Sequence, residues 1–421
     1  MNKNYRKVIL DNGITLLVHG DKTMKKTFVS FTVKYGSSGQ FFKFNYDGKE
    51  YNVLPGCAHF LEHMLGEHSQ YGDLYNLFHS YKYSNNAYTS LDRTKYYFSG
   101  TSKIKSSIKK LIYSIEKPVF TRNDVKETSN AIVEETKMGL DDSYFAAALL
   151  SLRNLYANVD LVDESLSAIG NEETTKKLDY DMLKLCYDAF YYDENKIIVV
   201  AGNIDEDDII NYIKGIYKNI KRHENKTKLY IPEDITKIRK ENDILRRYVE
   251  DDYLLIDYNN FIEGFSRFEV SNFIRYIGIT YFSNKSKFYE RLKSEGILLS
   301  YDGSDYNFTL IDGAITYGFS FFVRNYKKFL EEFSKEIKSI KFNKDDFELF
   351  KKASISDIIS REDDKYGYYI YLSDSVVFYN EELDELEETK KLSFDRLVEF
   401  YNKFDLNNRV ITLLTKEGYN G

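Results

Sequence analysis

The segment Cys57-Ala58-His59-Phe60-Leu61-Glu62-His63-Met64-Leu65 carries two histidines four residues apart, with a glutamate directly before the second. On a helix, residues three or four apart lie on the same face, so His59, Glu62 and His63 are expected to point to one side. Two neutral imidazoles and a carboxylate directed at one point suit a catalytic zinc ion. The pattern predicts a metal-bearing helix over 56–66 and makes a zinc peptidase the first hypothesis.

A helix with two surface histidines and an ordinary carboxylate is the alternative interpretation. The chain has only 6 histidines in 421 residues. Four of them, His59, His63, His68 and His79, are clustered in one part of the sequence. This clustering favours the metal site.

A catalytic zinc ion takes three protein ligands, so a third must be found. Glu67 is one turn after His63, but Gly66 is expected to end the helix there. His68 and His79 lie in a polar, turn-like stretch. A single helix cannot easily close a tetrahedral site with ligands two turns apart, which argues against Glu67, whereas His68 and His79 are possible.

A stronger candidate lies on the helix expected over 122–138, which has Thr121 at its N-cap. Val125, Ile132 and Met138 are expected to mark its inward face. Its carboxylates are Glu127, Glu134 and Glu135, of which Glu135 shares that face, whereas Glu134 is rotated away. A carboxylate on an apolar face needs a partner, which zinc or a nearby lysine would provide.

These segments resemble the pitrilysin/insulinase family of zinc metallopeptidases, the inverzincins, and most closely its short bacterial, processing-type members. The resemblance covers most of the chain and rests on Leu10–Leu16, Gly36–Gly39, Gly56–Met64, Asn86–Ser90, Thr94–Tyr97 and Glu134–Met138. In the last segment the position that matches the family's distal ligand is Glu135. The resemblance therefore implies one zinc ion per chain, held by His59, His63 and Glu135.

Glu62 is then the candidate general base, which takes a proton from the attacking water and returns it to the leaving amine. By resemblance, a peptide substrate adds to the strand at Asn86, Ala87 and Tyr88. Tyr317 and Arg324 are candidates for a tyrosine–arginine pair that relatives direct at the substrate. A structural tyrosine on a strand is the alternative for Tyr317.

One departure from the family pattern concerns Thr128. Relatives usually carry a glutamate there, two turns before the distal ligand, and Glu127 is one residue off. An active endopeptidase for unfolded peptides or small peptide precursors is the main hypothesis. A non-catalytic or partner-dependent peptide-binding subunit is the alternative, and a zinc hydrolase of other substrates is a weaker one. By resemblance we expect a homodimer, or a heterodimer with an inactive homologous chain.

Composition narrows the class of protein. A net charge of −7 with mixed signs argues against nucleic-acid partners. Neither a membrane span nor a signal peptide is predicted, so we expect a cytoplasmic chain. Cys57 and Cys186 are too few for a disulfide framework.

The order of elements predicts an α+β fold of two related halves, each a mostly antiparallel sheet covered by helices. The alternating segment at 27–33 and the segment 195–201 read as strands, and Asn12-Gly13 reads as a tight turn. We expect a zinc-bearing half over 1–220, a charge-rich linker over 221–245, and a second half without a metal over 246–421. The second half contains no histidine and cannot duplicate the site.

Overall fold

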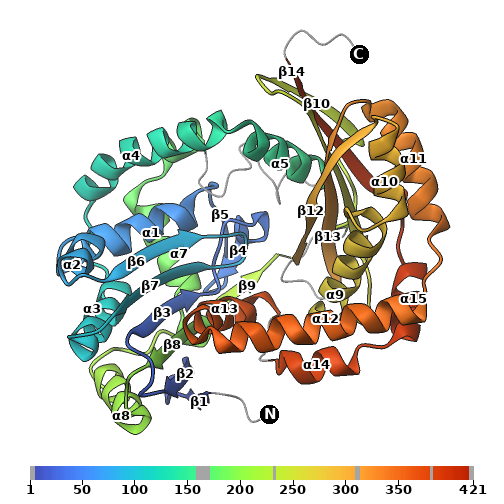
Figure 1. Cartoon of the computed structure of the whole chain (residues 1–421). Coiled ribbons are helices and arrows are strands. Elements are labelled where there is room, and N and C mark those ends of the chain that lie inside the picture. The colour runs from blue at the N-terminus through green and yellow to red at the C-terminus, as the bar shows by residue number, and fades with distance from the viewer. Residues whose placement is uncertain (1–4, 158–170, 231–233, 309–312, 380–382, 417–421) are drawn as a thin grey trace. The chain divides into compact units, whose positions relative to one another are not determined.

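The computed structural model describes residues 5–157, 171–230, 234–308, 313–379 and 383–416 (Figure 1). The chain forms two compact units that interleave in sequence. The first unit comprises Met1–Lys137, Ser167–Tyr230 and Arg361–Glu382. The second comprises Met138–Leu166, Ile231–Ser360 and Leu383–Gly421.

A six-stranded sheet organises the first unit, in the order β1-β2-β8-β3-β7-β6. All neighbouring strands run antiparallel except β2 and β8, which run parallel. The strands are β1 (Arg6–Ile9), β2 (Thr15–Gly20), β3 (Thr27–Val33), β6 (Ser84–Thr89), β7 (Thr94–Gly100) and β8 (Lys196–Gly202). The predicted turn between β1 and β2 is present, and Gly13 takes φ +99° there. This left-handed conformation favours glycine.

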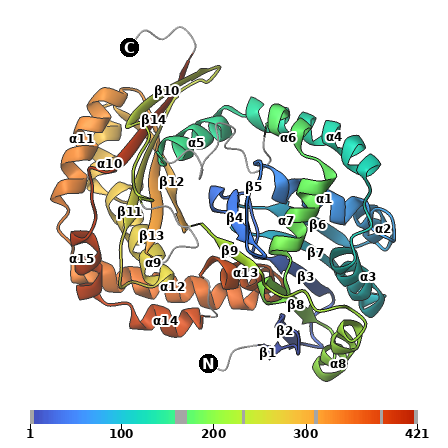
Figure 2. The same ribbon diagram turned by 180° about the vertical axis from the view of Figure 1, so that it is seen from behind.

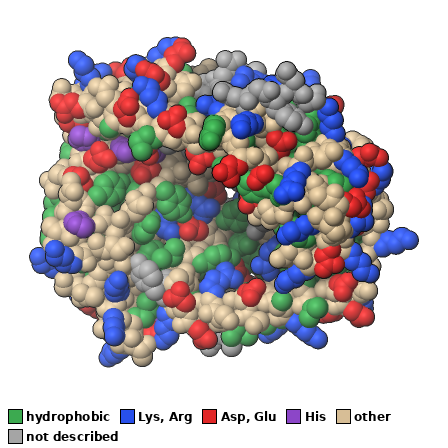
Figure 3. Space-filling view, turned by 45° about the horizontal axis from the view of Figure 1, so that its top comes forward, with side chains coloured by type: hydrophobic (Ala, Val, Ile, Leu, Met, Phe, Trp, Pro, Cys, Tyr) green, Lys and Arg blue, Asp and Glu red, His purple; other side chains and the backbone are tan. Residues whose placement is uncertain are grey.

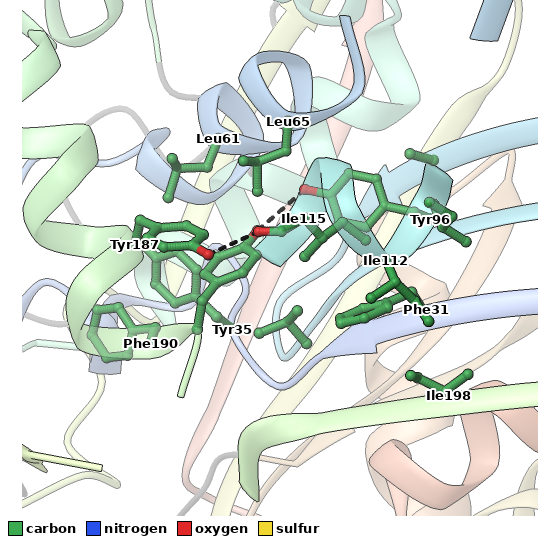
Figure 4. Packing of buried hydrophobic residues seen from close by; sticks show 14 of the residues in the cluster. Phe31, Tyr35, Leu61, Leu65, Tyr96, Ile112, Ile115, Tyr187, Phe190 and Ile198 are labelled. Carbon is green, nitrogen blue, oxygen red and sulfur yellow. Dashed lines mark hydrogen bonds between the residues drawn. The ribbon is translucent and has the colours of Figure 1, made fainter. Parts of the chain in front are cut away.

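The central strands β3 and β8 are buried along their whole length because helices cover both faces of the sheet. On one face, Val29, Phe31 and Ile198 join a large core (Figure 4). On the other face, Phe28 and Ile197 pack against a helix from late in the chain, α13 (Lys365–Phe378). The two faces alternate residue by residue, as the pleat of a strand requires.

The remaining elements of the first unit support this sheet. A second, three-stranded sheet has the order β5-β4-β9. Its strands are β4 (Lys43–Tyr46), β5 (Lys49–Asn52) and β9 (Thr227–Leu229). The helices are α1 (Cys57–Glu67), α2 (Leu74–Ser80), α3 (Ile104–Glu116), α4 (Arg122–Asp141), α6 (Glu172–Lys177), α7 (Tyr180–Phe190) and α8 (Glu206–Tyr217), with short 3-10 turns at Gly39–Phe41 and Asp193–Asn195.

The second unit is built on a five-stranded sheet in the order β10-β14-β11-β13-β12 (Figure 2). Only β10 and β14 run parallel. The strands are β10 (Asn242–Arg247), β11 (Asp252–Phe261), β12 (Leu298–Phe308), β13 (Ala314–Val323) and β14 (Arg409–Lys416). The helices are α5 (Ser143–Asn154), α9 (Arg267–Ile277), the π-helical turn η4 (Gly278–Phe282), α10 (Lys287–Ser294), α11 (Tyr326–Ser339), α12 (Lys344–Asp363), α14 (Glu385–Lys391) and α15 (Phe394–Asn402).

The predicted fold class is confirmed, since both units are mainly antiparallel sheets covered by helices. The course of the chain differs from the continuous ranges 1–220 and 246–421. Residues 138–166 belong to the second unit and residues 361–382 to the first. The segment 221–245 also contributes β9 and the start of β10 rather than only a linker, and its residues 231–233 lie outside the described ones. Among the described residues, no helix has the length and apolarity that crossing a membrane needs.

Candidate metal centre and active site

Helix α1 carries the histidine–glutamate motif and is largely buried. It begins after Gly56, whose φ of +93° favours glycine at this N-cap. The apolar residues Phe60, Leu61 and Met64 join the core of the first unit. His59 and Glu62 are also buried, with 5% and 7% of their surface exposed. Buried polar side chains need partners, and those of α1 come from β6, from α4 and from α1 itself.

His59, His63 and Glu135 form the group that could hold a metal ion. The Nε2 atoms of the two histidines are 3.3 Å apart. Glu135 Oε1 lies 3.6 Å from Nε2 of His59, and its Oε2 lies 3.4 Å from Nε2 of His63. The structure therefore brings together the three predicted ligands from α1 and α4.

The spacing of these atoms fits zinc. Zinc binds imidazole nitrogen and carboxylate oxygen at about 2.0–2.2 Å, so the ligand atoms of a tetrahedral site lie roughly 3.3–3.5 Å apart. The Nε2–Nε2 distance, and the distance from each histidine to its nearer oxygen of Glu135, fall at or close to this range. Two imidazoles and one carboxylate also form a donor set that catalytic zinc sites use. The residues present therefore fit the ion that the motif implies.

Glu67 orients one of the two histidines. Its Oε1 lies 2.7 Å from Nδ1 of His63, and the hydrogen bond from His63 lowers the pKa of the Glu67 carboxyl. With the imidazole proton held at Nδ1, Nε2 is left as the metal-binding atom. Nδ1 of His59 is buried and has no hydrogen-bond partner among the described residues. Glu67, which was considered above as a third ligand, thus supports the ligand His63 through this hydrogen bond.

Glu62 lies on the same side of α1 and is bound to the sheet. Thr89, the last residue of β6, donates a hydrogen bond of 2.7 Å to Oε2 of Glu62. Burial raises the pKa of the Glu62 carboxyl above its ordinary value, and His59 and this hydrogen bond act against that rise. A carboxylate with a raised pKa is a better proton acceptor near neutral pH. The Oε1 atom is left to take part in chemistry.

The predicted peptide-binding strand is the last strand of the sheet. Among the described strands, β6 has only β7 as a neighbour. The N–H of Ala87 donates to the side-chain oxygen of its own neighbour Asn86, at 2.9 Å, and Asn86 is exposed. Tyr88 donates its hydroxyl to Asp374 on α13. An outer strand with free backbone groups can accept an added peptide strand.

Helix α4 begins with the predicted cap. Oγ1 of Thr121 accepts a 3.3 Å hydrogen bond from the N–H of Asp124, and the Asp124 carboxylate accepts one of 2.6 Å from the N–H of Thr121. One expectation for this helix is wrong, because Met138 is 75% exposed instead of facing inward. The Glu135 side chain is half exposed at the border of the buried face. Glu134 pairs with Lys137 at 3.0 Å.

The second-unit candidates lie in different environments. Tyr317 on β13 is 2% exposed, and its ring is stacked between those of Tyr258 and Phe404. This burial supports its alternative interpretation as a structural residue. Arg324 is exposed just after β13 ends. The structure does not bring the two side chains together as a pair, since six residues of β13 lie between them.

Sequence reasoning missed two residues of the site. The spacing of His63 and Glu67 is that of helical neighbours, so their contact could have been found from the sequence. Thr89 gave no comparable signal, because its contact with Glu62 depends on how β6 packs against α1.

In the space-filling view, histidine side chains (purple) reach the surface close to acidic ones (red) (Figure 3).

Comparison with known proteins gives two family matches and several similar chains. Residues 47–155 match the model of insulinase (Peptidase family M16), and residues 177–254 match that of the Peptidase M16 inactive domain. The chain is 31% identical over 205 residues to the uncharacterized zinc protease YmfH of Bacillus subtilis, covering 49% of this chain and 47% of the relative. It is 24% identical over 227 residues to the uncharacterized zinc protease YmxG of the same organism, covering 53% and 51%. The aligned region spans about half the length of these curated relatives.

The fold is also that of a solved structure. A putative M16-like peptidase from Alicyclobacillus acidocaldarius superposes with a TM-score of 0.87 at 21% identity, covering 98% of each chain. The chain carries Peptidase M16 (insulinase) domains and has homologues named zinc proteases, which is consistent with the pitrilysin-like family that its motif indicated.

Proposed function

We propose that this chain is a zinc-dependent endopeptidase that cleaves unfolded peptides or small peptide precursors. The observation that carries the proposal is the arrangement of His59, His63 and Glu135 at tetrahedral ligand spacing, with Glu62 beside them. Family relatives named zinc proteases support the peptidase role.

The residues of the site have separate roles. His59, His63 and Glu135 would hold one zinc ion per chain, which when bound supplies a Lewis acid for the scissile carbonyl and acidifies a water molecule. Glu62 takes the proton of the attacking water at its carboxylate and later passes it to the leaving amine. Thr89 fixes the carboxylate by its hydrogen bond to Oε2.

The substrate is bound through its backbone. An extended peptide adds to the outer edge of β6 at Asn86, Ala87 and Tyr88, with main-chain hydrogen bonds that do not depend on sequence. Thr89 belongs to the same strand and contacts Glu62, so the bound peptide runs past the general base. Only an extended chain can pair in this way, which restricts substrates to unfolded segments.

A non-catalytic or partner-dependent peptide-binding subunit is the second candidate. The match of residues 177–254 to the inactive-domain model favours it. The intact ligand set and Glu62 favour the active enzyme. A homodimer, or a heterodimer with an inactive homologue, and a cytoplasmic location remain part of the proposal.

The substitution Glu62→Gln tests the proposed role of Glu62. It keeps the size and hydrogen-bonding capacity of the side chain but removes the proton acceptor. We expect the zinc content to stay at one ion per chain while cleavage of a quenched unfolded peptide falls by about 10²–10⁴-fold.

Glu134→Gln is the matched control, because Glu134 is 70% exposed and pairs with Lys137. It should cleave the peptide like the wild type. Cleavage at the wild-type rate by Glu62→Gln would reject Glu62 as the base. A wild-type chain that binds zinc without cleaving would favour the second candidate.

A further inference from the structure

Helix α4 contacts α1 at a second place besides Glu135. His68, the C-cap residue of α1, lies with its Nε2 atom 2.8 Å from Oγ1 of Thr128. Its Nδ1 atom lies 3.5 Å from Oδ1 of Asp124, one turn earlier on α4. Thr128 is 5% exposed, so its hydroxyl is in a buried position where a partner matters.

The two contact points share one face of α4. Thr128 and Glu135 are seven residues apart, which is two turns, or about 10.5 Å along the axis, with a rotation of only about 20°. On α1, His68 follows the metal-binding histidines, and its N–H bonds to the carbonyl of Met64 at 3.2 Å. Val125 and Ile132 already pack α4 in the core, and two polar attachments on one face restrict its distance and rotation further than one does.

Glu135 needs such an attachment. Its side chain is half exposed, and among the described residues its carboxylate pairs only with His59 and His63. Neither the core nor a neighbouring cation directs it toward the site. Its position therefore depends on where the backbone of α4 is held.

We propose that His68 and Thr128 are positioning residues that hold α4 against α1 so that Glu135 reaches the metal. They do this at the position where relatives usually carry a glutamate. The proposal rests on the zinc site of the proposed function and adds two residues that do not touch the ion. Asp124 assists by orienting the imidazole of His68.

Zinc affinity of the full chain, measured by competition with a chromophoric chelator, tests this assignment. Thr128→Val keeps the shape and removes the hydroxyl, and we expect the zinc dissociation constant to rise about 10–100-fold. Thr128→Ser keeps the hydroxyl and should bind like the wild type. Thr136→Val is the matched control, because Thr136 is equally buried on α4 but its hydroxyl bonds only to Ile132 of the same helix.

A second background separates positioning from general stability. In a Glu135→Gln chain, Thr128→Val should cause no further loss of zinc affinity, since the residue through which it acts is gone. The visible spectrum of the cobalt-substituted Thr128→Val chain should shift toward that of Glu135→Gln. If Thr128→Val does not fold, His68→Gln serves instead, with His79→Ala as its control.

Wild-type affinity in both Thr128→Val and His68→Gln would overturn the proposal. An equal loss in the wild-type and Glu135→Gln backgrounds would also overturn it, since that result marks a purely structural contact. Failure of the proposed function looks different, because the wild type itself would then bind no zinc, or bind zinc and cleave nothing.

Discussion

The sheets of the two units share the same order and directions of five strands, but helix α1 of the first unit and helix α9 of the second bury different side chains. Strands β2, β8, β3, β7 and β6 have the same order and directions as β10, β14, β11, β13 and β12. Along the chain, β10 and β11 are followed directly by α9, whereas β2 and β3 are followed by the short strands β4 and β5 and then by α1. Helix α1 buries His59 and Glu62. Helix α9 instead buries Phe273 and Tyr276, which pack among other aromatic rings.

Two helices, α5 and α13, each follow a helix of one unit in the chain and pack on the sheet of the other, and we call them the exchanged helices. Helix α5 follows α4 and packs on β10, β11 and β14 of the second unit, while α13 follows α12 and packs on β3 and β8 of the first. The backbone plan is thus repeated, whereas the chemistry is not. The comparison teaches that the site is made by side chains placed on one of two similar scaffolds.

The exchanged helices are held by opposite electrostatics. In the first unit, Asp374 on α13 pairs with Lys95 at 3.2 Å and with Arg93 at 3.6 Å. In the second, Ser151 on α5 donates its hydroxyl to Asp257 on β11. The first contact needs a charged carboxylate, whereas burial of Asp257 favours its neutral form even though the hydrogen bond from Ser151 acts against this.

The largest effect is expected from Asp374→Ala. It leaves Lys95, which is 1% exposed, buried without its carboxylate partner. Breaking a buried ion pair from one side costs about 3–5 kcal/mol of unfolding free energy. Urea unfolding should show this loss, and hydrogen exchange should locate it at β3 and β8. Lys95→Met should lose less, because it leaves no buried cation; a wild-type midpoint for Asp374→Ala would refute the role of the pair.

The contact at Asp257 should respond to pH instead. Burial raises the pKa of the Asp257 carboxyl to about 7, against about 3.9 in an unfolded chain. Between these values the folded chain binds more protons than the unfolded one, so its unfolding free energy falls as pH rises. Asp257→Asn should remove this decline and stabilise the protein by as much as about 4 kcal/mol above pH 7. Thermal unfolding at pH 5 and pH 8 measures it, and equal pH slopes for wild type and variant would contradict it.

The smallest effect is expected from Tyr317→Phe. The hydroxyl of Tyr317 is buried and has no hydrogen-bond partner among the described residues. Removing an unsatisfied polar group is neutral or stabilising by about 1 kcal/mol. Peptide cleavage should therefore stay at the wild-type rate while the melting temperature holds or rises. A tenfold loss of cleavage without unfolding would instead support a substrate contact for Tyr317.

Local periodicity predicted most of the fold and the central part of the site. The spacing of His59, Glu62 and His63 fixed their common face because a helix repeats every 3.6 residues. The alternation in β3 predicted a strand for the same kind of reason. Met138 was wrongly expected to be buried, because an apolar side chain near the end of a helix can be exposed.

What the sequence did not predict depends on contacts between distant segments. The bond between Thr89 and Glu62 and the exchange of α5 and α13 leave no local pattern. The short strands β4, β5 and β9 carry too few residues for a clear periodicity. These features follow from how elements pack together.

Metal content together with peptide cleavage, in wild type, Glu135→Gln and the control Glu134→Gln, tests the central claim most directly. We predict about one zinc ion per chain and chelator-sensitive cleavage in the wild type and the control. Glu135→Gln should lose cleavage and hold much less zinc at the same metal concentration. A wild-type chain without zinc, or Glu135→Gln with the zinc content and cleavage rate of the wild type, would contradict the account.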